Sequence, residues 1–250
     1  GCRGGDIIFE VVLRFYMGSC KFPIRKKFSI RKMSRRFSYL LVALVAMIMA
    51  FSSCSTKKNT AASRNWQAFT TRYNVYYNGS EHYKEQLKMM ENDYEDDYTR
   101  LVLMHPAEAR SNTKLPQPKG DFKRTIEKMQ KAIQLHSIKK KPKRKAGEKK
   151  TEKTIRWYAK KEYNPFLHNA WMLMGKAQFQ KGEFLEAAST FSYITRLYSD
   201  EPEIVAEARM RMAQCYAELE WNYEAETLLT QMQRDTIPYQ LAEEYEAIMA

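Results

Sequence analysis

The chain has 250 residues and a formal net charge of +13, with 42 Lys and Arg against 29 Asp and Glu. Apolar residues make up 44% of the sequence, too many for a wholly disordered protein, and nine Gly with eight Pro exclude collagen-like and Gly-rich classes. Because β-branched runs are few and helix-forming residues are many, the composition favours an all-α fold.

The positive charge is unevenly distributed along the chain. Residues 1–53 carry ten basic and two acidic side chains, and residues 139–161 carry twelve and two. Residues 162–250 instead carry six basic and fifteen acidic side chains. A strongly basic protein often binds nucleic acid. Here the average combines a basic leader, a short basic run and an acidic C-terminal region, so we expect no nucleic-acid partner.

Residues 33–53 have the pattern of a lipoprotein signal peptide. Basic residues precede an apolar stretch, 39–51, which is about as long as a signal-peptide core and shorter than the roughly 20 residues of a membrane span. Ser52-Ser53-Cys54 follows and resembles a bacterial lipobox. We therefore predict that the leader is cleaved and that Cys54 is acylated. An uncleaved N-terminal anchor helix is the alternative.

The segments on either side of this leader have different expected fates. Residues 1–32 do not fit a signal peptide, and Met33 stands where a start is expected, so we interpret 1–32 as upstream sequence read through. Residues 54–64 are polar and small, which is typical of a flexible tether below the lipid. The mature chain would keep only Cys54 and Cys215, so a lipidated Cys54 leaves no internal disulfide.

Residues 65–138 are predicted to form a helical N-terminal region. Aromatic residues at positions 66, 69, 73 and 76 recur at helical spacing and predict a first helix over 65–77. Asn78 and Gly79 tolerate the left-handed conformation, which predicts the end of that helix. Ser80 would then cap a second helix, so that the two form a helical hairpin.

Residues 139–161 are predicted to form an exposed basic linker, since Pro142 and Gly147 break the helical pattern. The run 139–145 resembles a nuclear import signal or a polyanion-binding segment. Nuclear import is not accessible behind a lipobox. Three interpretations remain open: a solvated linker, docking to an acidic partner or to anionic lipid head groups, and pairing with the acidic C-terminal region of the same chain.

Residues 162–250 match the 34-residue tetratricopeptide pattern, with two complete copies and a truncated third. Small residues at Gly175 and Ala187 would let the two helices of a hairpin approach closely. The residues expected to pack within and between the repeats are Trp171, Gly175, Ala187, Phe191, Ala213, Tyr216, Ala225 and Leu229. The predicted fold is all-α, with tetratricopeptide-type hairpins stacked as a right-handed α-solenoid.

The last predicted helix begins near Pro238 and carries apolar residues at 241, 245, 248 and 249. Stacked repeats bury their apolar faces only against neighbouring repeats, and a natural end carries a polar cap. We therefore expect this face to pack on a further helix, and the chain to be the front part of a longer repeat protein.

Chemistry-bearing motifs are absent from the sequence. It has no Gly-rich phosphate loop, no His-Glu-x-x-His motif and four scattered histidines, so we predict no enzymatic activity, metal site or cofactor. The repeat positions that usually line a concave binding surface are Asn169, Met172, Lys176, Phe179, Gln180, Glu207, Met210 and Gln214. This mixed apolar and acidic set favours a protein partner. Packing between repeats is the alternative for its apolar members.

Two segments of the chain resemble a known family. Thr71-Arg-Tyr-Asn-Val-Tyr-Tyr-Asn-Gly-Ser-Glu81 and Glu162-Tyr-Asn-Pro-Phe-Leu-His-Asn-Ala-Trp-Met-Leu-Met-Gly-Lys176 are similar to the PorW/SprE-type tetratricopeptide lipoproteins of the Bacteroidota type IX secretion system. The resemblance covers about 33–250. Members of that family are longer, so this chain would be an N-terminal fragment.

The resemblance implies a non-enzymatic scaffold, lipid-anchored through Cys54 at the periplasmic face of the outer membrane. It would hold together periplasmic ring and translocon components and support protein secretion and, in gliding species, motility. Ser55-Thr-Lys-Lys58 has no acidic residues after the Cys, which favours the periplasmic face over surface export. The alternative is another periplasmic tetratricopeptide lipoprotein, such as an outer-membrane protein assembly factor.

Overall fold

The computed structural model describes residues 59–99, 102–111, 114–144, 147–235 and 237–249, which belong to one compact unit, Ser55–Ala250. Every regular element of these described residues is helical, which confirms the predicted all-α class. The elements are α3 (Ala61–Thr70), η1 (Thr71–Tyr76), α4 (Tyr77–Asp93), η2 (Pro106–Arg110), α5 (Lys123–His136), α6 (Glu152–Ala159), α7 (Leu167–Lys181), α8 (Phe184–Leu197), α9 (Pro202–Glu218), α10 (Asn222–Arg234), η3 (Tyr239–Leu241) and α11 (Ala242–Met249). The predicted signal peptide and Cys54 lie outside the described residues.

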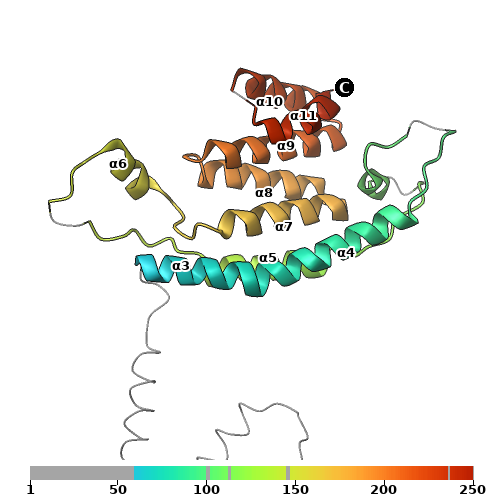
Figure 1. Cartoon of the computed structure of the whole chain (residues 1–250). Coiled ribbons are helices and arrows are strands. Elements are labelled where there is room, and N and C mark those ends of the chain that lie inside the picture. The colour runs from blue at the N-terminus through green and yellow to red at the C-terminus, as the bar shows by residue number, and fades with distance from the viewer. Residues whose placement is uncertain (1–58, 100–101, 112–113, 145–146, 236, 250) are drawn as a thin grey trace, which may run out of the picture. The chain divides into compact units, whose positions relative to one another are not determined.

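The first part of the described chain is one uninterrupted helical rod. The Thr60 side chain caps its start by accepting a hydrogen bond from the Ser63 amide at 3.1 Å, and α3 then continues through the π-helix η1 into α4 (Figure 1). No turn separates the two halves, so the predicted hairpin is wrong. Asn78 and Gly79 lie within α4.

The packing of Gly79 explains why the sequence pattern predicted a turn that the structure does not have. The residue is buried where α4 meets α5, and a Cβ built on it would lie 2.3 Å from the terminal methyl of Met129. Gly79 thus serves close packing between two helices, and its tolerance of left-handed backbone is not used. The predicted aromatic face of this rod is also largely exposed. Trp66, Phe69 and Tyr73 are each more than half accessible to solvent.

Apart from α6, the remaining α-helices pack in chain order as successive layers. The contacts run from α5 to α7, from α7 to α8, from α8 to α9 and from α9 to α10, with α11 against α9 and α10 (Figure 1). Consecutive helices therefore form pairs, and each pair contacts the next. The rod contributes to the first layer, since α4 and η1 both pack against α5.

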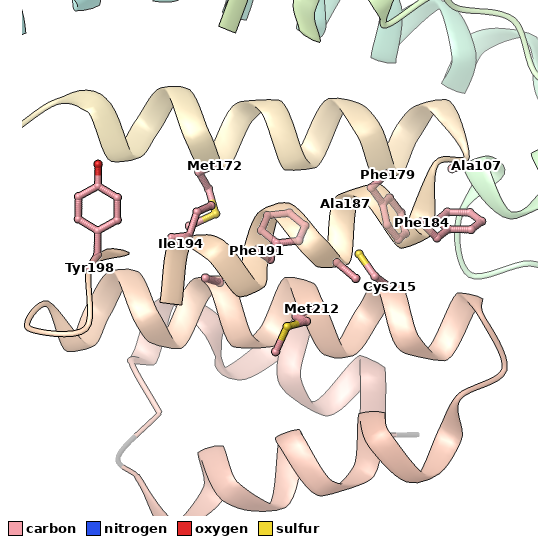
Figure 2. Packing of buried hydrophobic residues seen from close by; sticks show 12 residues of the cluster. Ala107, Met172, Phe179, Phe184, Ala187, Phe191, Ile194, Tyr198, Met212 and Cys215 are labelled. Atoms are coloured by element: carbon pink, nitrogen blue, oxygen red, sulfur yellow. The ribbon is translucent and has the colours of Figure 1, made fainter. Parts of the chain in front are cut away.

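The centre of the core lies between α7, α8 and α9 (Figure 2). Phe191 of α8 is 1% exposed, and a Cβ added to Gly175 of α7 would lie 2.6 Å from its ring. The glycine therefore makes room for the aromatic ring, as the sequence predicts. Ala187 of α8 and Ala208 and Cys215 of α9 lie in the same cluster, where their small side chains let α8 and α9 approach closely.

Local signals set the helix ends in this part. Gly182 ends α7 with φ 86°, the left-handed conformation that glycine adopts without strain, and Pro202 opens α9 in its first turn. The linker contains a helix that the sequence analysis missed. Thr151 caps α6 by accepting a hydrogen bond from the Thr154 amide at 3.3 Å.

A buried polar cluster joins the rod to the layered helices. The Glu162 carboxylate is 5% exposed and accepts hydrogen bonds from the amides of Ile138 (2.8 Å) and Asn164 (2.9 Å). The Asn164 amide group donates to Thr71 Oγ1 at 3.2 Å and to the His136 carbonyl at 2.9 Å. Because buried polar groups are costly without partners, this cluster fixes how η1, α5 and the start of α7 meet.

The apolar face predicted for the last helix has partners within the chain. Tyr245 of α11 is 8% exposed and packs with Met210, Ala213, Leu229 and Met232 from α9 and α10. Its hydroxyl donates to the Leu229 carbonyl at 3.2 Å. The expectation that this face packs on a further helix is therefore wrong for Tyr245. Met249, on the same predicted face, is 47% exposed.

Within the described part of the chain, none of the helices has both the length and the apolar character needed to cross a bilayer.

Candidate partner-binding groove

A groove of about 650 Å³ along the layered helices lies between α4, α7, α9 and η3. Both apolar and charged side chains line it. Its lining residues are Tyr76, Ser80, Tyr83 and Lys84 of the rod, His168, Asn169, Met172, Leu173 and Lys176 of α7, Glu203, Ile204 and Glu207 of α9, and 238–241. A groove of this size with both kinds of side chain can hold an extended or helical segment of a protein.

A smaller cavity of about 250 Å³ shares Tyr83 and Lys176 with this groove. It is lined by Tyr83, His105, Lys176, Phe179, Gln180, Phe191, Arg211 and Gln214. In the described residues, Gln180 Oε1 and Arg211 Nε are buried without a hydrogen-bond partner. This inner cavity therefore offers one free acceptor and one free donor to a polar group or to water.

Most of the groove residues predicted from the repeat pattern line these two cavities. Four line the main groove, namely Asn169, Met172, Lys176 and Glu207, and four line the inner cavity, namely Lys176, Phe179, Gln180 and Gln214. Met172 and Phe179 are also nearly buried, so they contribute to the core as well.

Met210 does not lie at the groove, and this part of the prediction is wrong. It is fully buried and packs with Ala213, Leu229 and Tyr245 between α9, α10 and α11. The helix α11 covers the position that the repeat pattern leaves open to a ligand.

Two ion pairs at or beside the two cavities join helices that are not consecutive in the chain. Lys176 Nζ lies 2.7 Å from Glu207 Oε1, which joins α7 to α9, and Arg211 lies 2.7 Å from Glu244 of α11. Each of these four side chains remains partly exposed. The pairs therefore keep charged groups at the surface, where a charged group of a partner protein can replace one member of a pair. Because the pairs are exposed, their own contribution to the stability of the fold is small.

An acidic pair lies beside the inner cavity. The Glu218 carboxyl of α9 hydrogen-bonds with Glu108 of η2, and burial together with this neighbouring carboxylate raises the pKa of Glu218 to about 8. Burial also lowers the pKa of His105, which lies edge-on to Phe179 with ring centres 5.7 Å apart. At neutral pH the Glu218 carboxyl and the His105 ring therefore both favour their uncharged forms.

The sequence analysis missed the contribution of the rod to the groove. Tyr76, Ser80 and Tyr83 follow helical spacing, and this spacing was available in the sequence. The predicted hairpin at Asn78 placed these residues in two separate helices and hid their common face. The η2 segment was also not predicted, although its Ala107 packs into the central core.

The residues predicted to pack within and between the repeats are buried or half-buried. Gly175, Ala187, Phe191, Ala213, Ala225 and Leu229 are buried, and Trp171 and Tyr216 are half-buried against the same clusters. Cys215 is buried in the core, and burial raises the pKa of its thiol. The described residues contain no group of three or more His, Cys, Asp and Glu side chains placed to hold a metal ion.

No family model matches the chain, and a search of curated proteins finds no match either.

Proposed function

We propose that the chain is a non-enzymatic, lipid-anchored scaffold of the type IX protein secretion system, which binds other proteins at the periplasmic face of the outer membrane. The observation that carries the binding role is the groove of about 650 Å³ between α4, α7, α9 and η3. Its lining combines apolar surface with paired charges, the mixture that protein segments recognise. The secretion-system assignment rests on the resemblance of 71–81 and 162–176 to the PorW/SprE-type lipoproteins.

The arrangement of the layers supports a tetratricopeptide-type solenoid. Consecutive helix pairs contact each other in chain order, and Gly175 admits Phe191 at the position where the repeat pattern puts a small residue against an aromatic one. In such a stack the first helix of each pair lines a concave surface. The groove residues of α7 and α9 occupy those positions. We assign the rod and α5 to the layer that closes the N-terminal end of the stack.

The lipid anchor in this proposal is Cys54. Two or more acyl chains hold a protein stably on a bilayer. The described helices begin seven residues later, at Ala61. The scaffold would therefore present its groove close to the membrane, among ring and translocon components.

A co-purification experiment tests the binding role. The full-length protein is cross-linked in cells and purified from membranes, and ring and translocon components are measured by quantitative mass spectrometry. Tyr239→Ala in the groove should reduce the recovered partner severalfold, since its side chain is 94% exposed at η3. The matched control is Tyr223→Ala on α10, which is 78% exposed and outside the cavities described above. Equal recovery from both variants would place the partner elsewhere.

A further inference from the structure

The basic run lies beside the start of the rod, far from it in sequence. The Asn59 side-chain amide donates a hydrogen bond of 2.7 Å to the carbonyl of Lys140, across 81 residues. Arg64 of α3 stacks over the ring of Trp157 in α6, with its guanidinium carbon 4.8 Å from the ring centre. These two contacts hold both ends of the linker against the start of α3 and the residue before its N-cap.

The side chains of this run are open to solvent, although the Arg144 guanidinium also lies over the Tyr158 ring, 4.9 Å from its centre. Lys139, Lys140, Lys141, Lys143 and Arg144 are exposed. Within the described part of the chain, no ion pair joins any of these five to the acidic region 162–250. The ion pair that does join the linker to that region involves Lys160 and Glu201, at 2.8 Å. The structure therefore does not show the acidic region of the chain neutralising the basic run.

The tether places this charge near a lipid surface if Cys54 is acylated. Four residues lie between Cys54 and Asn59. The five residue steps from one to the other span at most about 18 Å when fully extended. The carbonyl of Lys140 is bonded to Asn59. A lysine side chain adds further reach towards the bilayer, and electrostatic attraction acts within about 8 Å at physiological ionic strength.

We propose that the basic run 139–144 is a docking surface for an anionic phospholipid bilayer, which orients the scaffold on the membrane. This inference rests on the lipid anchor of the proposed function. Acyl chains alone leave a protein free to rotate on its tether. A basic surface beside the anchor adds a second contact, since lysine and arginine near an anionic membrane each strengthen binding. The start of α3 then faces the lipid, and the rod holds the layered helices above it.

Vesicle binding tests the surface without its anchor. The mature chain from residue 54 with Cys54→Ala carries no acyl group, and its residues Ser55–Ala250 form their own compact unit. It is mixed with vesicles of phosphatidylcholine alone, or of phosphatidylcholine with phosphatidylglycerol as about a third of the lipid, and sedimented. We expect binding to the anionic vesicles only, and loss of that binding at high salt.

Charge reversal locates the contact. Lys140→Glu with Lys141→Glu should weaken vesicle binding about tenfold or more, since each lysine near the surface contributes several-fold. The control is Lys123→Glu with Arg124→Glu, the same change of charge on exposed residues at the start of α5. That position lies one helix length, about 21 Å, from the end of α5 that leads into the basic run. The control should change binding less than about twofold.

Three results would overturn the inference. They are equal binding to neutral and anionic vesicles, an equal effect of the two charge reversals, and no vesicle binding at all. An acidic protein as the true partner of the run would give the last of these. Acylation of Cys54 is measured separately by mass spectrometry on the wild-type protein, so a failed lipid surface and a failed lipid anchor give different results.

Discussion

The Asn164 side chain donates a hydrogen bond of 3.2 Å to the hydroxyl of Thr71, 93 residues earlier in the chain. Both side chains are almost fully buried. The bond connects the π-helical turn η1 to the segment that leads into α7. The N-terminal helical region and the layered helices therefore share one interior, and a partner that binds the groove touches both.

Glu162 should be the most sensitive polar residue of this junction. Glu162→Ala removes the acceptor of several buried amides, including those of Ile138 and Asn164, so we expect a loss of about 3 kcal/mol in the free energy of unfolding. The thermal midpoint should fall by roughly 6–12 °C, measured by calorimetry. Glu152→Ala, which removes only an exposed pair with Arg156, should leave the midpoint unchanged. Similar shifts for both variants would contradict this role.

The two buried glycines should respond in opposite ways to alanine. Gly175→Ala forces a methyl group to within 2.6 Å of the Phe191 ring in a packed core, so we expect a net destabilisation of about 1–2 kcal/mol. Gly79→Ala crowds the terminal methyl of Met129, the far end of a flexible side chain, and gains helix propensity, so its effect should be near zero or stabilising.

Chemical denaturation of both variants checks the glycine prediction. Phe191→Leu added to Gly175→Ala should recover part of the loss, because the smaller side chain gives the new methyl group room. A Gly175→Ala protein as stable as the wild type would show that α7 and α8 are not held this closely.

The acidic pair gives a prediction for pH. The pKa of Glu218 is raised to about 8 in the folded protein, so the folded state binds this proton more tightly than the unfolded state. The stabilisation is complete below the ordinary carboxyl pKa and is lost as pH rises through about 8. Since Glu218 is partly exposed, the loss should be on the order of 1 kcal/mol, or about 3 °C.

Thermal melts between pH 5 and pH 8 measure this loss. Glu218→Gln should have a flatter dependence than the wild type and a higher midpoint at pH 8. Glu224→Gln, an exposed carboxyl on α10, is the control and should follow the wild type. Parallel curves for Glu218→Gln and the wild type would mean that the two carboxyls do not share a proton.

Sequence reasoning worked where one residue type had one physical role. The packing of Gly175 against Phe191 required only that a small side chain face a large one. The hairpin at Gly79 failed because glycine has two uses, a left-handed turn and a close helix contact, and only the tertiary packing against Met129 decides between them. The assignment of Met210 to the groove failed because α11 covers this residue, and the repeat pattern carries no information about the following helix.

The lipid anchor can be tested in cells. Cys54→Ala should move the protein from the membrane fraction to the soluble fraction, because the acyl chains would be lost. Ser55→Ala, which leaves the acylated position intact, is the matched control and should stay with the membranes. Membrane retention of the Cys54→Ala protein, in the absence of acylation, would favour an uncleaved N-terminal helix as the anchor.

Secretion of type IX cargo after deletion of the gene tests the central claim most directly. The strain of origin is compared with the deletion strain and with the deletion strain complemented by the full-length gene, and cargo in the medium is measured beside the level of assembled outer-membrane barrels. The scaffold proposal predicts that deletion abolishes cargo secretion, that barrel assembly stays normal and that complementation restores secretion. Normal secretion with defective barrel assembly would contradict the proposal and favour an assembly factor.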